Sequence, residues 1–174
     1  MYICLITMWE KIKNYFEGSP SKLKVAKLLV EMGFRINDEG NIFCGDVQIQ
    51  ATKIAEAIHI DRRVVTETAK AILDTADLKQ LFLHLKPAGP LLRDVAKYLG
   101  YGVVEIRAQP DAPGIIAEAA TLLSRAGISI RQILAEDAEI YPDPILIIIT
   151  DHTIPGELIH QFLHIPTVQQ VTIS

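Results

Sequence analysis

The sequence predicts an α+β protein of two domains, a mostly helical one over residues 8–99 and one of βαββαβ order over residues 100–174. Apolar residues recur at helical spacing in the first part, whereas short strands alternate with short helices in the second. The formal charge changes at the same place. Residues 1–100 carry 14 Lys and Arg against 12 Asp and Glu, a net +2, and residues 101–174 carry 3 against 9, a net −6. Two modules with different partners are therefore expected.

The elements of the first domain are predicted from helix start and stop signals. Ser19 and Pro20 form a good helix start, because a hydroxyl can cap the first turn and proline needs no hydrogen bond there. Gly33 ends that helix. The turn-rich residues 35–49 indicate a loop or a short hairpin. The other predicted elements of this domain are helices over residues 8–18, 52–58, 62–76 and 90–100 and a strand over residues 79–86.

The second domain is predicted to be ferredoxin-like, with both helices on one face of an antiparallel sheet. The continuous apolar run Ile145–Ile149 is typical of a strand that is covered on both faces. Because two short helices cover only one face, we expect the other face to meet the sheet of a second copy, in a homodimer or a higher oligomer. The predicted strands cover residues 102–109, 129–139, 144–151 and 168–174, and the predicted helices cover residues 114–127 and 155–164.

The predicted helices 52–58 and 62–76 are joined by only His59, Ile60 and Asp61, which is the spacing of a helix-turn-helix element. This stretch resembles bacterial and archaeal helix-turn-helix regulators. The resemblance implies a residue in the left-handed conformation at His59, where such motifs usually have glycine; histidine is among the residues that tolerate this conformation. The predicted strand 79–86 would then serve as the wing of a winged helix-turn-helix-like domain.

The outward face of the second helix of this pair is predicted to contact double-stranded DNA through Arg62, Arg63, Thr66 and Lys70. Glu67 lies on the same face and would repel phosphate unless it is turned away or aimed at a cytosine amino group. The alternative is a solvated helix that serves only protein contacts. The inner side of this helix is expected to consist of Val65, Ala69, Ile72 and Leu73.

The sequence QPDAPG, residues 109–114, comes directly before the first helix of the second domain. At a helix N-terminus the first backbone N–H groups lack partners and the helix dipole favours an anion. A carboxylate could therefore bind the N–H groups of Gly114, Ile115 and Ile116, while Asp111 accepts the ammonium group of the same molecule. Ser129, at the entry of the next strand, could add a hydroxyl group. The alternative is that Pro-Gly only starts the helix and Asp111 only caps it.

Residues 101–174 resemble an ACT domain, the small-molecule regulatory module of amino-acid metabolism, through the D-x-P-G turn and the entry Gly-Ile-Ser-Ile at 127–130. The resemblance implies an amino acid bound between the first turn and the second strand, at an interface between two copies. Many ACT domains have asparagine at one or both polar positions where this chain has Asp111 and Ser129, and some only dimerise. The implied ligand-binding residues are Asp111, Gly114, Ile115, Ser129 and Ile130.

Other chemistry is weakly indicated. His160 and His164 have the i, i+4 spacing of a metal clamp, but the glutamate of an H-E-x-x-H motif is missing and the pair is expected to face solvent. The acidic residues of AEDAE (135–139) fit a solvated hairpin. The chain has no glycine-rich phosphate loop, nucleophile elbow or paired acid and base carboxylates, so neither an enzyme nor a cofactor is expected.

The two halves together resemble a group of archaeal and bacterial proteins regarded as regulators of amino-acid metabolism, from about Met8 to the C-terminus. We therefore expect a transcriptional regulator that binds DNA and an amino-acid effector. The alternatives are an amino-acid sensor that regulates an enzyme by protein contact, and a metal-responsive regulator. Isolated Cys4 and Cys44 and the absence of a membrane-length apolar run indicate a cytoplasmic protein without a membrane partner.

Overall fold

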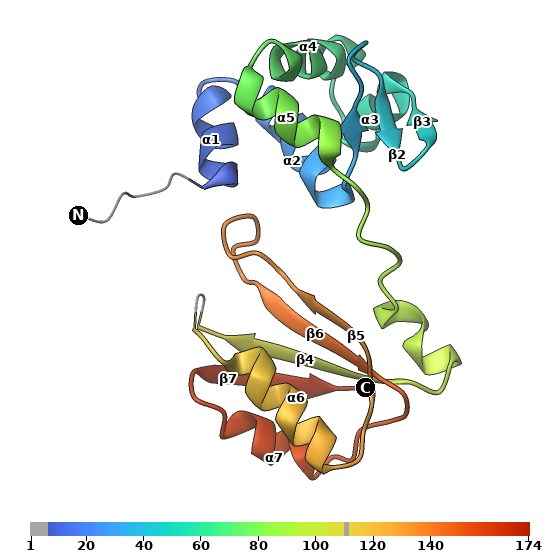
Figure 1. Cartoon of the computed structure of the whole chain (residues 1–174), viewed down its shortest axis with the longest axis vertical. Helices are drawn as coiled ribbons and strands as arrows, with labels where there is room; N and C mark the ends of the chain where they lie inside the picture. The colour runs from blue at the N-terminus through green and yellow to red at the C-terminus, as the bar shows by residue number, and fades with distance from the viewer. Residues whose placement is uncertain (1–6, 110–111) are drawn as a thin grey trace, which may run out of the picture. The chain divides into compact units, whose positions relative to one another are not determined.

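The computed structural model describes residues 7–109 and 112–174. The chain divides into two compact units, Met1–Gly89 and Pro90–Ser174, which we call the first and second units. Over the described residues it is a mixed α+β protein with one antiparallel sheet in each unit (Figure 1). Within the described residues no helix is both long and apolar enough to cross a membrane.

The first unit consists of helices packed with a small antiparallel sheet of strand order β1-β2-β3. The N–H of Gly33, at φ 63°, bonds the carbonyls of the last turn of α2, which confirms this residue as the helix end. The short hairpin expected within residues 35–49 is also present, as β2 and β3. The elements are α1 (Met8–Tyr15), α2 (Pro20–Met32), β1 (Arg35–Ile36), β2 (Ile42–Cys44), β3 (Val47–Ile49), α3 (Ala51–Ala57), α4 (Arg62–Leu73) and α5 (Ala76–His84).

The predicted strand 79–86 is wrong, because this segment belongs to helix α5. Its alternation of polar and apolar residues fits a strand, but Leu78 and Phe82 are four residues apart and are buried together on one side of the helix. The helix begins at Ala76, after a break at Asp74 and Thr75, so α4 ends at Leu73 rather than at residue 76. This segment therefore cannot serve as a wing.

The second unit has the expected βαββαβ order, with strand order β5-β6-β4-β7 and antiparallel neighbours throughout. Helices α6 and α7 lie together on one face of this sheet (Figure 1). They bury an apolar cluster that includes Leu123 and Phe162 against Val104, Ile106 and Ile148. The elements are a 3-10 helix η1 (Arg93–Tyr98), β4 (Gly102–Ala108), α6 (Ile115–Arg125), β5 (Ile130–Ala135), β6 (Ile145–Thr150), α7 (Leu158–Leu163) and β7 (Val168–Ile173).

Part of the second face of the sheet is covered by η1 of the same chain. Every residue of β6 is buried, as expected for a strand covered on both faces. On the face away from the helices, Ile147 and Ile149 pack in a cluster with Ala96 of η1 and the half-buried Leu92. The centre of this face is therefore buried within the chain, whereas Gln170 and Thr172 of β7 are exposed on it. A partner sheet on this face stays a prediction.

The boundary between the units lies at residues 89 and 90, not at 99 and 100 as the sequence predicted. Residues 90–99 belong to the second unit because hydrogen bonds and apolar packing hold them to its sheet. The side-chain amide of Gln132 in β5 accepts a hydrogen bond from the N–H of Leu92 and donates one to the carbonyl of Pro90, both at 2.9 Å. The glycine at the end of this segment, Gly100, marks only the turn into β4.

Candidate functional site

Helices α3 and α4 form the closely connected pair that the sequence predicted, with only residues 58–61 between them. His59 has φ 54°, so it takes the left-handed conformation expected at this position. The N–H of Ile60 then bonds the carbonyl of Ala55 at 3.0 Å, which ends α3. Asp61 caps the next helix, because its carboxylate accepts the N–H of Arg63 at 2.7 Å.

The outward side of α4 is exposed as predicted, whereas the inner side differs from the prediction at two residues. The outward residues Arg62, Arg63, Thr66 and Lys70 are all exposed. On the inner side Val65, Ala69 and Ile72 are buried, whereas Leu73 is only half-buried. Thr68 is a buried residue that the pattern missed; its hydroxyl donates to the carbonyl of Val64 at 2.7 Å, which satisfies it inside the helix packing.

The charges on the outward face of α4 are mostly positive. Among the described residues, Arg62, Arg63 and Lys70 make no ion pair. The carboxylate of Glu67 lies 3.2 Å from the ammonium group of Lys22 in α2, so its charge is offset within the protein. Beside this face lies a hollow of about 590 Å³, lined by the N-terminal parts of both helices: Gln50, Ala51, Thr52, Arg62, Arg63, Thr66 and Glu67.

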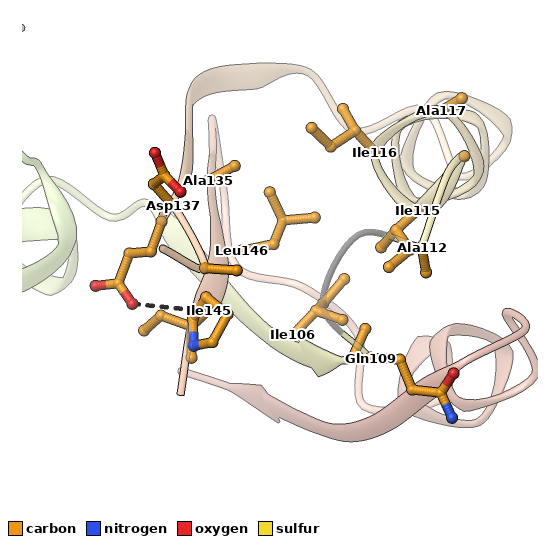
Figure 2. Close-up of a pocket in the computed structure, with 15 residues that line it drawn as sticks. Ile106, Gln109, Ala112, Ile115, Ile116, Ala117, Ala135, Asp137, Ile145 and Leu146 are labelled. Carbon is orange, nitrogen blue, oxygen red and sulfur yellow. Dashed lines mark hydrogen bonds between the residues drawn. The ribbon is translucent and has the colours of Figure 1, made fainter. Parts of the chain in front are cut away.

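The second unit holds a cavity of about 630 Å³ at the N-terminal end of α6. The end of β4, the beginning of α6 and the connection from β5 to β6 line it, and it is open to solvent. Figure 2 shows the apolar side chains of Ile106, Ile116 and Leu146 around it. The lining residues are Ile106, Ala108, Gln109, Ala112, Gly114, Ile115, Ile116, Ala117, Ala135, Glu136, Asp137, Ala138, Pro144, Ile145 and Leu146.

The polar groups of this cavity lie at its two sides. On one side the helix begins at Gly114, whose φ of 93° is left-handed. The first helical hydrogen bond runs from Glu118 N to Gly114 O, so among the described residues the N–H groups of 115–117 have no partner within the chain. On the other side, Glu136 accepts the N–H of Ile145 at 3.1 Å and Asp137 accepts the N–H of Glu139 at 2.9 Å.

The structure brings together only part of the predicted ligand-binding set. Gly114 and Ile115 line the cavity. Ser129 and Ile130 do not, because they follow the far end of α6, and 11 helical residues span about 16 Å. Asp111 lies outside the described residues.

Several lining residues come from places the sequence interpretation left aside. Glu136 and Asp137 belong to the acidic segment that was expected to be only a solvated hairpin. Ile106 and Gln109 come from the end of β4. In the sequence, only the predicted order of strands and helices could have indicated these residues. In a βαββαβ order, the end of the first strand, the start of the first helix and the end of the second strand lie at the same edge of the sheet.

Ser129 instead belongs to a polar cluster with Asp151 and His152. The Asp151 carboxylate accepts the N–H of Ser129 at 3.2 Å and lies 2.7 Å from His152 Nδ1. Burial is the largest single influence on the pKa of Asp151 and raises it. The Ser129 hydrogen bond, then the charge and the hydrogen bond of His152, outweigh burial, so the pKa lies below its ordinary value of 3.8.

His160 and His164 lie on α7 and after it, both exposed. The Nδ1 atom of His164 lies 2.5 Å from the carbonyl oxygen of His160, so that ring nitrogen bonds the backbone. Within the part of the chain that the structure describes, no group of three or more His, Cys, Asp or Glu side chains could hold a metal ion.

No known family model matches this sequence, and no curated protein matches it. Among solved structures, one titled "Crystal structure of PH0061" aligns over 88% of this chain and 88% of its own, with 14% sequence identity and a TM-score of 0.27. A likeness at that TM-score carries no argument about either unit.

Proposed function

We propose that this protein is a transcriptional regulator of amino-acid metabolism. Its first unit would be a helix-turn-helix DNA-binding domain, and its second unit an ACT domain that binds a free amino acid. The observation that carries the proposal is the outward face of α4. It follows a turn with a left-handed residue, and it presents Arg62, Arg63, Thr66 and Lys70 to solvent.

The chemistry of α4 supports a contact with duplex DNA. A helix with its side chains is about 10–12 Å across, so α4 fits a major groove about 12 Å wide, and its 12 residues extend over about 18 Å. Two arginines in its first turn can bind phosphates or guanine edges, and Thr66 can bind either. The β2–β3 hairpin precedes α3 in the chain, so any wing would come from there rather than from α5.

The cavity at α6 supports an amino-acid effector with an apolar side chain. Its walls offer the aliphatic groups of Ile106, Ile116 and Leu146, which suit such a side chain. The carboxylate of the ligand would bind the N–H groups at the start of α6. Its ammonium group would bind Asp111, and Asp137 on the opposite wall provides a further carboxylate.

An effector controls DNA binding only if its affinity differs between the DNA-competent and incompetent states. In a dimer, two copies of α4 must lie about 34–36 Å apart to enter successive major grooves. A ligand held between second units would change that separation. Ser129 and Ile130 could then contribute to the ligand site from the other copy.

The DNA half of the proposal is tested by fluorescence anisotropy with the protein's own promoter region over a range of salt concentrations. Replacing Arg62 and Arg63 together by alanine should reduce the slope of log affinity against log salt by about 2. Arg125→Ala, in the second unit, is the matched control and should leave DNA affinity unchanged. Absence of any salt-dependent promoter affinity in the unchanged protein, with and without amino acids, would refute the regulator.

The effector half is tested by thermal shift against the twenty amino acids. A ligand at 100 times its dissociation constant stabilises a protein by about 2.7 kcal/mol. We expect an aliphatic amino acid to give the largest shift and Asp111→Ala to abolish it. Ser129→Ala should weaken the shift only if two copies build the site. If no amino acid gives a shift at millimolar concentration, the ACT-type sensor is excluded while the DNA result stands.

A further inference from the structure

Residues 90–99 pack against the sheet of the second unit on one side and expose apolar side chains on the other. Ala96 of η1 is completely buried against the sheet. The Gln132 amide fastens the start of the segment, and Arg93 Nε lies 2.5 Å from the carboxylate of Glu105 in β4. The segment is therefore held against the sheet of its own unit, with its other side chains on the outside.

The helix type determines which side chains share the outer surface. In a 3-10 helix, side chains three residues apart are eclipsed and form straight rows. Val95 and Tyr98 form one such row, with exposed fractions of 43% and 78%. Leu91 and Leu99 flank them and are also exposed. Exposed apolar residues that cluster in this way are found at protein, membrane or ligand contacts.

The neighbouring row carries one charge of each sign. Asp94 and Lys97 are three residues apart, and both are exposed. Within the described part of the chain neither takes part in an ion pair, although the Lys97 ammonium lies 4.9 Å from the centre of the Tyr98 ring. If a second copy is related to the first by a two-fold axis through the middle of this row, Asp94 of each copy faces Lys97 of the other. The surface is complementary to itself.

We propose that the surface formed by Leu91, Asp94, Val95, Lys97, Tyr98 and Leu99 binds the same surface of a second copy of this chain. The two η1 segments would run antiparallel across a two-fold axis, as an isologous contact requires. Val95 and Tyr98 would form the apolar centre, and a tyrosine is suited to this place because it contributes a large area with few rotatable bonds. Two Asp94–Lys97 pairs would flank them.

This contact goes beyond the proposed function, because it requires neither DNA nor an amino acid. It also differs from a sheet-to-sheet dimer, because η1 rather than the sheet forms the contact. Because the segment is held by Gln132 and Arg93, it loses little freedom when it binds, which favours association.

The charge pairing is tested by sedimentation velocity on the full chain over a range of concentrations. The unchanged protein should be a dimer. D94K and K97D each place like charges opposite one another at two points, and each should raise the dimer dissociation constant by about tenfold or more. The double variant D94K/K97D restores opposite charges across the axis and should return the dissociation constant to within about threefold of the original.

The apolar centre is tested with a matched pair of variants. Tyr98→Ser should raise the dimer dissociation constant by more than about 30-fold, whereas Leu163→Ser, which changes an exposed apolar residue on α7, should leave it unchanged. Circular dichroism spectra and midpoints of thermal unfolding verify that both variants fold.

Three outcomes would overturn the inference. One is an unchanged protein that stays monomeric, as it would if its own first unit covered this surface. Another is a dimer that neither D94K nor Tyr98→Ser weakens, which would place the interface elsewhere. The third is a D94K/K97D variant that remains as dissociated as the single variants, since the two-fold pairing predicts rescue.

Discussion

Lys22 in α2 holds the carboxylate of Glu67 at 3.2 Å, on the face of α4 that we propose contacts DNA. The ion pair is partly exposed, so its contribution to stability is about 0–1 kcal/mol. Its larger effect is on the charge of that face, because a phosphate that approaches Arg63 also approaches Glu67. With Lys22 beside it, the glutamate repels phosphate less.

Loss of the Lys22 charge should therefore weaken DNA binding, although Lys22 lies outside α4. Lys22→Gln should lower affinity by a factor of about 2–10 at low salt, and Glu67→Gln should raise it by a similar factor, both effects shrinking as salt screens them. Lys27→Gln is the control, because Lys27 pairs with Glu31 within α2. Fluorescence anisotropy measures the change. A drop in affinity with Glu67→Gln would instead mean that Glu67 contacts a base.

His59 stores strain in the turn before α4. At φ 54° the Cβ atom of His59 lies unfavourably close to the backbone, and glycine has no Cβ atom. Glycine, however, loses more conformational freedom on folding. His59→Gly should raise the free energy of unfolding by up to about 1 kcal/mol in urea denaturation. Ala57→Gly, two residues earlier in α3, should lower it by about 0.5–1 kcal/mol. Equal destabilisation by both would contradict the strain at His59.

The elements that the sequence predicted well are those in which the spacing of apolar residues agrees with the residues that begin and end helices and turns. The α3–α4 pair has a short connection and a residue that tolerates φ above zero, and the βαββαβ order has a glycine or proline at most of its turns. Helix α5 was missed because its residues alternate in polarity. Alternation fits a strand, and only the tertiary contact of Leu78 and Phe82 decides for a helix.

The candidate ligand site was predicted only in part for a different reason. Gly114 and Ile115 were identified because a helix start binds anions through local geometry. The remaining walls come from residues 106–109 and 135–146, and only the three-dimensional fold brings these to one edge of the sheet. Ser129 was assigned from its place at the entry of the next strand and from the resemblance, and in a single chain its backbone N–H bonds Asp151 instead.

Gln132 is expected to stabilise the second unit by fixing residues 90–92. Gln132→Ala removes both of its hydrogen bonds and should lower the free energy of unfolding by about 1–2 kcal/mol. Gln169→Ala in β7 is the control, because this side chain is exposed and, among the described residues, makes no side-chain hydrogen bond. Urea denaturation of the full chain measures both, and a loss no greater than that of the control would show that the segment is held without Gln132.

Asp151 should make stability depend on pH in the acid range. Its pKa is lowered on folding, so its contribution is present above the ordinary value of 3.8 and is lost as the pH falls through the folded-state value. Asp151→Asn should therefore be less stable than the unchanged protein at neutral pH, and the difference should disappear in strong acid.

A pH series of urea denaturations measures this difference. His152→Ala should reduce the pH-dependent part without removing it, because the N–H of Ser129 still bonds the carboxylate. A difference between Asp151→Asn and the unchanged protein that stays constant from neutral pH to strong acid would mean that the Asp151 charge plays no part.

Gly102 is required by close packing at the start of β4 rather than by its backbone conformation, since its φ is not left-handed. A Cβ atom there would lie 2.6 Å from Thr150 Oγ1 and 2.7 Å from the carbonyl oxygen of His152. These two atoms are already bonded to each other at 2.7 Å, so neither can move away without breaking that hydrogen bond. The buried hydroxyl of Thr150 would then lose its partner.

Gly102→Ala should therefore lower the free energy of unfolding by about 1–3 kcal/mol. Gly156 offers a matched control in the same unit, because its φ is also not left-handed and no described atom lies within 4 Å of the added Cβ. Gly156→Ala should change stability by less than about 0.5 kcal/mol. Thermal and urea unfolding of the two variants compare them directly. Equal stability would mean that the end of β6 can move away from β4, which the fully buried Thr150 argues against.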